Sequence, residues 1–398
     1  MSVERRDDPS SASPASNLEG VSVGVDARTV QQPGIGFSAY FKGAVRCLLD
    51  MGAQVCLLTN FPTEQYRELF PSTEWTWFGS RRNLIWDQYD LPRFLRKRQF
   101  DLYWAPTNNG IPFLPVKSTW TISTTHDLVP LRLPGLYLYR RPGFALPYVV
   151  WTAAAMLRSD TILTVSASSA RDIERYFFRR ATVIPPLFDN LAALGGRGTI
   201  PASLKDKSYV VYNGGLDPRK KVPNLLAAFA IVAGEWPDLS LALVGNGYEV
   251  FDPEIRSLGI SGSVVRTGFV DDETRTAIIE AAVAMAYPSL YEGFGLPLLE
   301  AFAAGTPVLT AANSSLVEVA GDAAIFVDPR DPDSIAAGVL KMRDPALTAE
   351  LRAKGRTRLE QFDPAMSRQR LGAELIRIAR AQEERSRRGW RRGRGRLA

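Results

Sequence analysis

The chain has 398 residues, of which 45% are hydrophobic and 23% are charged, and this balance predicts a globular protein of two domains. A membrane-spanning helix needs ~20 apolar residues. The longest apolar run, residues 144–157, contains Pro147 and stops at Arg158. The two cysteines, Cys47 and Cys56, stand alone and indicate no disulfide framework. These features argue against a transmembrane or secreted protein and favour the cytoplasm.

The formal net charge of +6 is concentrated at one end of the chain. Residues 385–398 contain seven arginines and no acidic residue, so the rest of the chain has no net positive charge. A nucleic-acid-binding protein would carry basic residues on its body, and nucleic acid is therefore not an expected partner. Two interpretations of the basic tail stay open: a disordered solubilising segment, or a peripheral contact with the anionic inner face of the cell membrane.

In chain order, residues 1–18 are rich in Ser, Pro and Asp and are predicted to be a disordered leader. Two sections follow in which short apolar runs alternate with longer amphipathic ones, the pattern of β-α-β units in a parallel sheet. Strands are predicted at residues 21–25, 54–58, 102–105, 119–122 and 161–165, and then at 209–212, 240–244, 264–266, 284–287, 307–309 and 324–327. A glycine-rich joint at residues 195–198 separates the two sections.

The predicted organisation is an N-terminal acceptor-side Rossmann-like domain at residues 19–195 and a C-terminal Rossmann-like domain at residues 199–363. A helix at residues 364–384 and the basic tail at 385–398 follow. The fold class is therefore α/β, with two doubly wound domains. Such sheets bind ligands outside the carboxyl ends of their strands, so the two domains are expected to face a central cleft.

The densest chemistry follows the predicted strand at 284–287, in the sequence Pro-Ser-Leu-Tyr-Glu-Gly-Phe-Gly-Leu-Pro-Leu-Leu-Glu that ends at Glu300. Gly293 and Gly295 allow the loop to turn its N–H groups outward beside a helix start, which makes an anion site suited to a diphosphate. Glu292 and Glu300 can both face that site and accept hydrogen bonds from sugar or ribose hydroxyls. Glutamates can also merely decorate a helix start, but the flanking motifs disfavour that interpretation.

A second motif, Asn-Gly-Gly-Leu-Asp-Pro-Arg-Lys, joins the strand at 209–212 to a predicted helix at 224–233. Its turn includes Gly215, and its basic pair completes a phosphate cradle. Arg219 can fork onto two phosphate oxygens, and Lys220 can supply a point charge. Taken alone, the basic pair would be interpreted as solvent-exposed residues at the start of a helix. Because the two glutamates accompany it, the pair indicates phosphate binding.

Two features of the first section are weaker when taken alone. Gly34 and Gly36 follow the first strand and permit close backbone approach to a ligand, although a tight turn explains them equally well. The single histidine, His126, follows the predicted strand at 119–122, whose end would lie at the cleft. A lone histidine is more often structural than catalytic.

At Glu292 and Glu300 the sequence resembles the GT-B glycosyltransferases of family 4, whose signature is two glutamates separated by seven residues. The resemblance covers about residues 21–362 and implies the GT-B fold, a retaining reaction and a nucleotide-sugar donor. It further implies that Glu292 holds the donor hexose and that Glu300 binds the ribose diol. The amides implied in hexose binding are those of Phe294, Gly295 and Leu296.

The same resemblance assigns roles to residues outside the glutamate motif. Arg219 and Lys220 would neutralise the leaving diphosphate, and His126 would contact the donor sugar near the reacting centre. The loop with Gly34 and Gly36 would reach toward the diphosphate. Val270 lies in a segment implied to face the nucleobase.

No metal or other cofactor is predicted, because the sequence offers no cluster of His, Cys and acidic residues. An Asp-x-Asp sequence ends at Asp333, but this residue is predicted to cap a helix. The diphosphate is instead expected to be held by basic residues and helix amides.

The form of the phosphate motif resembles that of bacterial mannosyltransferases, which makes GDP-mannose the first choice of donor. UDP-glucose and related donors stay open, as does the acceptor, which is expected to be a sugar or lipid-linked glycan in cell-surface polysaccharide synthesis. Two alternatives remain: a UDP-sugar epimerase of similar architecture, and a non-catalytic nucleotide-sugar-binding protein. An inverting reaction would make His126 the candidate base.

Overall fold

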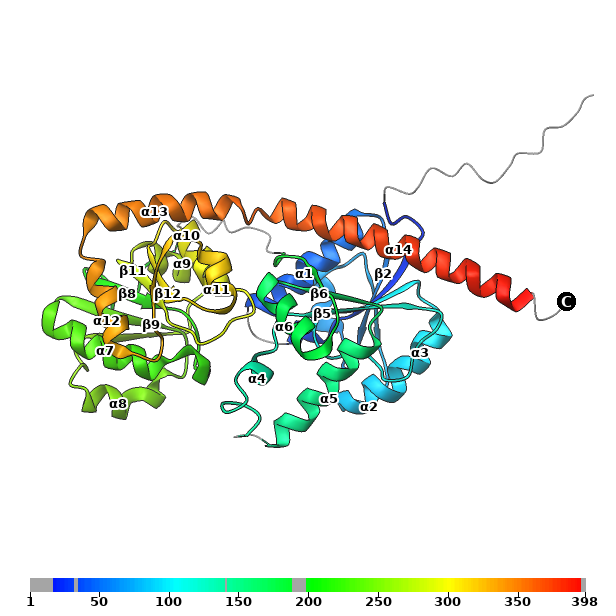
Figure 1. Cartoon of the computed structure of the whole chain (residues 1–398), viewed down its shortest axis with the longest axis horizontal. Coiled ribbons are helices and arrows are strands. Elements are labelled where there is room, and N and C mark those ends of the chain that lie inside the picture. Colours follow the sequence, from blue (N-terminus) through cyan, green and yellow to red (C-terminus); the bar gives the residue numbers. More distant parts are fainter. Residues whose placement is uncertain (1–16, 32–34, 140–141, 188–197, 395–398) are drawn as a thin grey trace, which may run out of the picture. The chain divides into compact units, whose positions relative to one another are not determined.

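The computed structural model describes residues 17–31, 35–139, 142–187 and 198–394 (Figure 1). Most of the predicted leader, the first three residues of the glycine-rich joint and Gly34 lie outside these ranges. The chain divides into two compact units: Met1–Thr124 with Trp151–Ile162 and Arg368–Ala398, and Thr125–Val150 with Leu163–Ser367. Segments 125–150 and 163–187 thus group with the second sheet, and the predicted limits of 19–195 and 199–363 remain predictions.

The first sheet is parallel and has the strand order β3-β2-β1-β4-β5-β6-β7. Its strands are β1 (Ser22–Asp26), β2 (Gln54–Thr59), β3 (Glu74–Trp77), β4 (Leu102–Ala105), β5 (Trp120–Thr125), β6 (Thr161–Thr164) and β7 (Thr182–Val183). The five predicted strands are present within three residues at each end. The edge strands β3 and β7 were not predicted, because β3 begins with exposed Glu74 and β7 has only two residues.

The second sheet, also parallel, has the order β10-β9-β8-β11-β12-β13. Its strands are β8 (Ser208–Tyr212), β9 (Leu239–Val244), β10 (Val264–Gly268), β11 (Ala284–Tyr287), β12 (Val308–Ala311) and β13 (Ala324–Val327), and all six are predicted. Every residue of β9, β11 and β12 is buried, as expected of strands covered on both faces by helices. This order, which runs outward both ways from β8 and β11, is that of a doubly wound fold.

Helices connect successive strands in both sheets. In the first sheet they include α1 (Ile35–Asp50), α3 (Leu91–Arg98), α4 (Val129–Arg132), α5 (Pro142–Arg158) and α6 (Ala167–Phe177). In the second they are α7 (Val222–Glu235), α8 (Asp252–Ser257), α9 (Asp272–Glu280), α10 (Leu296–Ala303), α11 (Ser314–Ala320) and α12 (Pro332–Lys341), followed by α13 (Pro345–Glu360). The helix at the Asp-x-Asp sequence begins at Pro332, two residues earlier than a cap at Asp333 would place it. Its cap is therefore Asp331, which accepts the Asp333 amide, and the assignment of Asp333 as the cap was wrong.

The C-terminal helix α14 (Pro364–Arg394), red in Figure 1, continues ten residues beyond the predicted end at 384. It packs on the first unit through Leu371, Leu375 and Ile378, all fully buried. Farther along, the Arg385 guanidinium lies 2.8 Å from the Asp160 carboxylate and stacks 4.6 Å from the centroid of the Trp120 ring. The basic segment therefore begins as part of a docked helix.

The outward face of α5 is apolar. Leu146, Val149 and Leu157 recur at helical spacing and have exposed fractions of 71%, 40% and 61%. No acidic residue occurs from residue 128 to residue 159. Among the described residues, no helix is both long and apolar enough to cross a membrane.

Candidate active site

The second sheet changes winding direction between β8 and β11, and the loops that leave these strands carry the two strongest sequence motifs. Loops at the carboxyl ends of parallel strands meet at such a switch point, where doubly wound folds bind ligands. The amide of Leu290 donates to the carbonyl of Arg219 at 2.8 Å and ties the two loops together. The structure therefore brings both motifs to one place.

Glycine is required at two positions of the loop after β11. Gly295 caps α10 with a φ of 115°, which side-chain-bearing residues rarely adopt. A Cβ on Gly293 would lie 2.4 Å from the carbonyl oxygen of His126. Pro297 lies in the first turn of α10, as predicted. The loop is thus held tightly beside the positive end of a helix.

Two amides of this loop have no acceptor within the part of the chain that the structure describes. Among the described residues, the N–H groups of Phe294 and Gly295 donate to no other protein group. The Phe294 ring packs edge-on against Phe362, with centroids 5.6 Å apart, and the residue is buried. Leu296 begins the helix.

Glu292 is buried and forms ion pairs with both basic residues of the second motif. Its Oε1 lies 2.6 Å from Nζ of Lys220, and its Oε2 lies 3.3 Å from Nη2 of Arg219. The Tyr287 hydroxyl donates to Oε1 at 3.2 Å. The Ser314 hydroxyl accepts the Glu292 amide at 3.0 Å. Side chain and backbone of Glu292 are therefore both fixed.

The charge state of Glu292 follows from these contacts. Burial alone would raise its pKa, but Lys220 and Arg219 outweigh burial and hold the pKa at about 2. Burial lowers the pKa of the Lys220 ammonium, and Glu292 opposes that effect. Glu292 is thus an anion at neutral pH and cannot act as a proton donor there.

The predicted phosphate cradle is held by hydrogen bonds and an ion pair within the protein. Gly215 has a φ of 74°, and its amide donates to the Tyr248 hydroxyl at 3.1 Å. Asp217 accepts the Arg219 amide at 3.0 Å and pairs with its guanidinium at 3.0 Å. Burial lowers the pKa of Arg219, but Glu292 and Asp217 outweigh burial and keep it above its usual range. Arg219 is therefore a cation whose position in the loop after β8 is fixed by Asp217 and Glu292.

Glu300 lies one turn into α10 and is also buried. Its Oε2 accepts the side-chain amide of Asn213 at 3.2 Å and lies 3.9 Å from Nε of Arg275. Burial raises the pKa of Glu300, an effect that Arg275 opposes. The two glutamates therefore differ: two cations contact Glu292, whereas one more distant arginine faces Glu300.

His126 lies half-buried in the loop after β5, and the structure brings its backbone to the glycine loop. Its carbonyl oxygen accepts the Ser169 hydroxyl at 2.9 Å and is the atom against which Gly293 packs. Desolvation raises the pKa of the adjacent Asp127, and Arg219 partly offsets that rise. The role of the imidazole remains a prediction.

Three predicted site residues remain: Gly34, Gly36 and Val270. Gly36 is half-buried in α1, which belongs to the first unit, and Gly34 lies outside the described residues. Val270 is half-buried in the loop between β10 and α9. Their roles stay predictions.

Sequence reasoning missed three residues of the site. Tyr287 ends a strand, where a tyrosine is usually a core residue, and Asn213 was part of a motif but was given no role. Arg275 sits in the middle of α9 with no local signal. Each is identified only by what it contacts across the fold: Lys220 and Glu292 for the first, and Glu300 for the other two.

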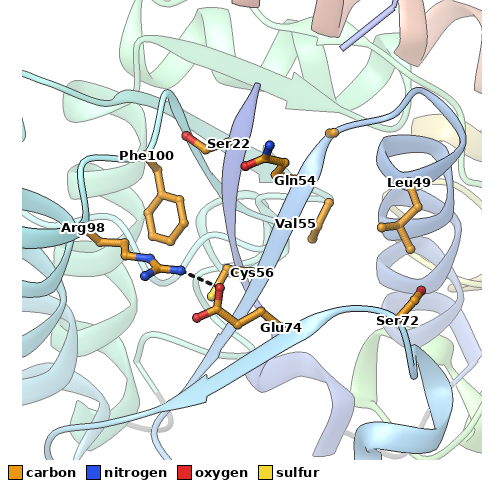
Figure 2. Close-up of a pocket in the computed structure, with 10 residues that line it drawn as sticks. Ser22, Leu49, Gln54, Val55, Cys56, Ser72, Glu74, Arg98 and Phe100 are labelled. Carbon is orange, nitrogen blue, oxygen red and sulfur yellow. Dashed lines mark hydrogen bonds and ion pairs between the residues drawn. The ribbon is translucent and has the colours of Figure 1, made fainter. Parts of the chain in front are cut away.

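A pocket of 480 Å³ opens in the first sheet, at the edge where its strands begin (Figure 2). Ser22, Gln54 and Glu74 begin strands β1, β2 and β3 there, and Glu74 pairs with Arg98 at 2.6 Å. Both members of this pair are about half exposed, so it is a weak surface ion pair. Arg98 is the single cation among the residues that line the pocket, and Figure 2 shows it paired with Glu74.

Comparison with known proteins agrees with the geometry at the second sheet. The model of Glycosyltransferase Family 4 matches residues 36–190, and that of Glycosyl transferases group 1 matches residues 200–358. O-antigen chain mannosyltransferase B of Escherichia coli is 34% identical over 63% of this chain and 68% of its own length. The Escherichia coli serotype-specific mannosyltransferase WbdA is 28% identical over 61% of this chain but only 31% of its own length.

Solved structures show the same fold. Sucrose-phosphate synthase of Thermosynechococcus elongatus matches with a TM-score of 0.71 at 19% identity, covering 91% of this chain and 100% of the other. WaaG, a glycosyltransferase of lipopolysaccharide biosynthesis, matches at 0.67 and 17% identity, covering 90% and 99%. HepE of Anabaena, solved with UDP and glucose, matches at 0.67 and 19%, covering 89% and 98%. The chain belongs to the family 4 glycosyltransferases and has the GT-B fold.

Proposed function

We propose that the chain transfers mannose from GDP-mannose, with retention of configuration, to a sugar or lipid-linked glycan acceptor in cell-surface polysaccharide synthesis. The observation that carries this proposal is Glu292, fixed between Lys220 and Arg219 beside the unpaired amides of the glycine loop. Two relatives that are 34% and 33% identical to this chain over the matched residues are named as mannosyltransferases, which supports mannose as the transferred sugar.

The site suits the departure of a nucleoside diphosphate. Cleavage of the sugar–phosphate bond places positive charge on the sugar and negative charge on the diphosphate. Arg219, Lys220 and the amides of Phe294 and Gly295 offer preorganised stabilisation for the negative charge. Glu292, as an anion, accepts hydrogen bonds from the sugar hydroxyls, and Glu300 accepts them from the ribose.

This chemistry needs no metal in our proposal, because the two cations and the helix start take the place that a divalent ion would fill. Among the described residues, no three His, Cys, Asp or Glu side chains gather as potential ligands. We expect transfer to continue in EDTA. Loss of transfer in EDTA that magnesium or manganese restores would overturn a metal-free reaction.

An assay of donor consumption with and without an acceptor distinguishes the proposed transferase from two alternative functions. A UDP-sugar epimerase would change the sugar in the absence of an acceptor, and a non-catalytic binder would leave the donor intact. We expect donor consumption that depends on an added acceptor.

Binding is screened first by thermal shift against GDP-, UDP- and dTDP-sugars, because a ligand bound only by the folded state raises the melting temperature. If only UDP-sugars raise the melting temperature, the donor is a UDP-sugar and not GDP-mannose.

We also propose that the protein contacts anionic membrane at the inner face of the cell, where a lipid-linked acceptor would lie. The basic end of α14 supports this, since each arginine near such a surface contributes about 1 kcal/mol. The apolar outward face of α5 offers side chains that can enter the interface. Asp160, the first acid after α5, is already paired with Arg385.

A further inference from the structure

Arg275 is a buried cation that the proposed reaction does not use. It lies in α9 with only 8% of its surface exposed, and a buried charge is costly unless it is paired. Its Nη1 lies 2.7 Å from Asp272, which is itself 71% exposed. Its Nε is buried and, among the described residues, has no hydrogen-bond partner. That N–H faces Oε2 of Glu300 at 3.9 Å, just beyond hydrogen-bond distance.

Glu300 receives its protein contacts on one oxygen. Asn213 donates to Oε2, and Arg275 also faces Oε2, whereas Oε1 accepts no bond from the described residues. The charged and polar groups that face this carboxylate are therefore few. Arg275 and Asn213 favour the anion, while burial and the Asp272 carboxylate favour the protonated acid.

We propose that Arg275 is a positioning residue for Glu300: it keeps the buried carboxylate anionic and anchored through Oε2, so that Oε1 accepts a hydroxyl of the bound nucleotide. The inference rests on the proposed function, in which Glu300 binds the donor ribose. A protonated Glu300 would lose part of its acceptor capacity, and the nucleotide would lose a charge-assisted hydrogen bond. A small approach of Glu300 when the nucleotide binds would also satisfy the orphaned Nε.

The first test needs no ligand. Without Arg275 the ionised Glu300 is buried beside Asp272 with no cation, so Arg275→Gln should lower the melting temperature more as pH rises. In acid, where Glu300 is protonated, the loss should be small. In a Glu300→Gln background the pH dependence of the loss should shrink to the part that comes from the exposed Asp272 carboxylate, because the buried charge coupled to Arg275 is gone. A loss that is equal at every pH, or that is unchanged in that background, overturns the pairing.

The second test measures GDP affinity by calorimetry between pH 6 and pH 9. The ratio of variant to wild-type affinity is used, because titration of GDP itself cancels in it. Arg275→Gln should weaken GDP about tenfold at neutral pH, which corresponds to about 1.4 kcal/mol. The ratio should return toward unity at high pH, where Glu300 ionises without help. Arg275→Lys, which keeps the charge, should lose less.

Arg358→Gln is the matched control. This half-buried arginine of α13 donates to the Val319 carbonyl at 2.9 Å, and its loss should lower stability without a pH-dependent change in GDP affinity. If the melting temperatures show that Arg275 and Glu300 are coupled, but Arg275→Gln leaves GDP affinity unchanged, then Arg275 is structural only and its positioning role is overturned. A wild-type chain that binds neither GDP nor UDP would instead overturn the proposed function, while the ligand-free cycle would still decide the pairing.

Discussion

At the scale of single residues, the site depends on two carboxylates in unlike surroundings. Glu292 is held by Lys220 and Arg219, and its pKa lies at about 2. Glu300 is faced by one arginine at 3.9 Å, and burial raises its pKa. The first is suited to the reacting sugar, where fixed charge matters most. The second is suited to recognition of the nucleotide.

Alanine at each glutamate should therefore have a different kinetic effect. Glu300→Ala should raise KM for the donor, because ribose hydrogen bonds are lost. Glu292→Ala should mainly lower kcat, because its contacts are to the reacting sugar. Each effect should be roughly 10- to 100-fold, in line with about 1.5–3 kcal/mol for a charged hydrogen bond. Wild-type kinetics in both variants, measured with a working acceptor, would place the site elsewhere.

The pH dependence should separate the same two residues. A carboxylate with a lowered pKa stays ionised until strongly acid pH, whereas one with a raised pKa is protonated earlier as pH falls. Acidification should therefore raise KM for the donor, through Glu300, before it changes any step that depends on Glu292. The check is a series of initial-rate measurements from pH 8 downward. A fall in kcat that precedes the rise in KM would contradict this order.

At the scale of elements, the sequence predicted all strands of the second sheet and the loop that carries the two glutamates. Continuous apolar runs and a glycine-proline helix start are local signals, so they survive without knowledge of the fold. The short edge strands β3 and β7 lack such a signal. Arg275 and Tyr287 were missed because their partners come from other elements, and only the packed structure brings those together.

The close approach of the glycine loop gives an element-scale prediction. Gly293→Ala would place a Cβ against the His126 carbonyl, so backbone must move, at a cost of roughly 1–3 kcal/mol. Stability and transfer should both fall, as measured by thermal unfolding and initial rates. Gly262→Ala is the control, since its Cβ would meet no atom within 4 Å. Equal behaviour of the two variants would contradict the tight placement of the loop.

The membrane proposal is tested on α14 and α5. A chain that ends at Ser386 keeps the Arg385–Asp160 ion pair but loses six of the seven arginines of the basic segment. Its sedimentation with anionic liposomes should fall most at low salt, because the attraction is screened within a Debye length. The double variant Leu146→Ser and Leu157→Ser should lower the binding that remains at high salt.

Val250→Ser is the control for the α5 variant, because Val250 is an apolar residue that is 66% exposed in the short 3-10 helix Tyr248–Phe251, outside α5. Transfer to a soluble acceptor analogue should stay intact in all three variants. Liposome binding equal to that of the full chain in both the truncated and the α5 variant would remove the membrane contact. A change in oligomeric state of the α5 variant would instead assign that face to a second copy of the chain.

At the scale of the whole molecule, the second unit alone holds both glutamates, both cations and the glycine loop. The chain belongs to a glycosyltransferase family, and the proposed reaction joins this donor site to a glycan acceptor. The most direct test is the anomeric configuration, determined by NMR, of the product formed from GDP-mannose and a glycan acceptor. The account predicts an α-mannoside, formed by the wild type and far more slowly by Glu292→Ala. A β-mannoside would contradict retention and make His126 the candidate base, and no mannosyl product from any glycan acceptor would contradict the proposed donor.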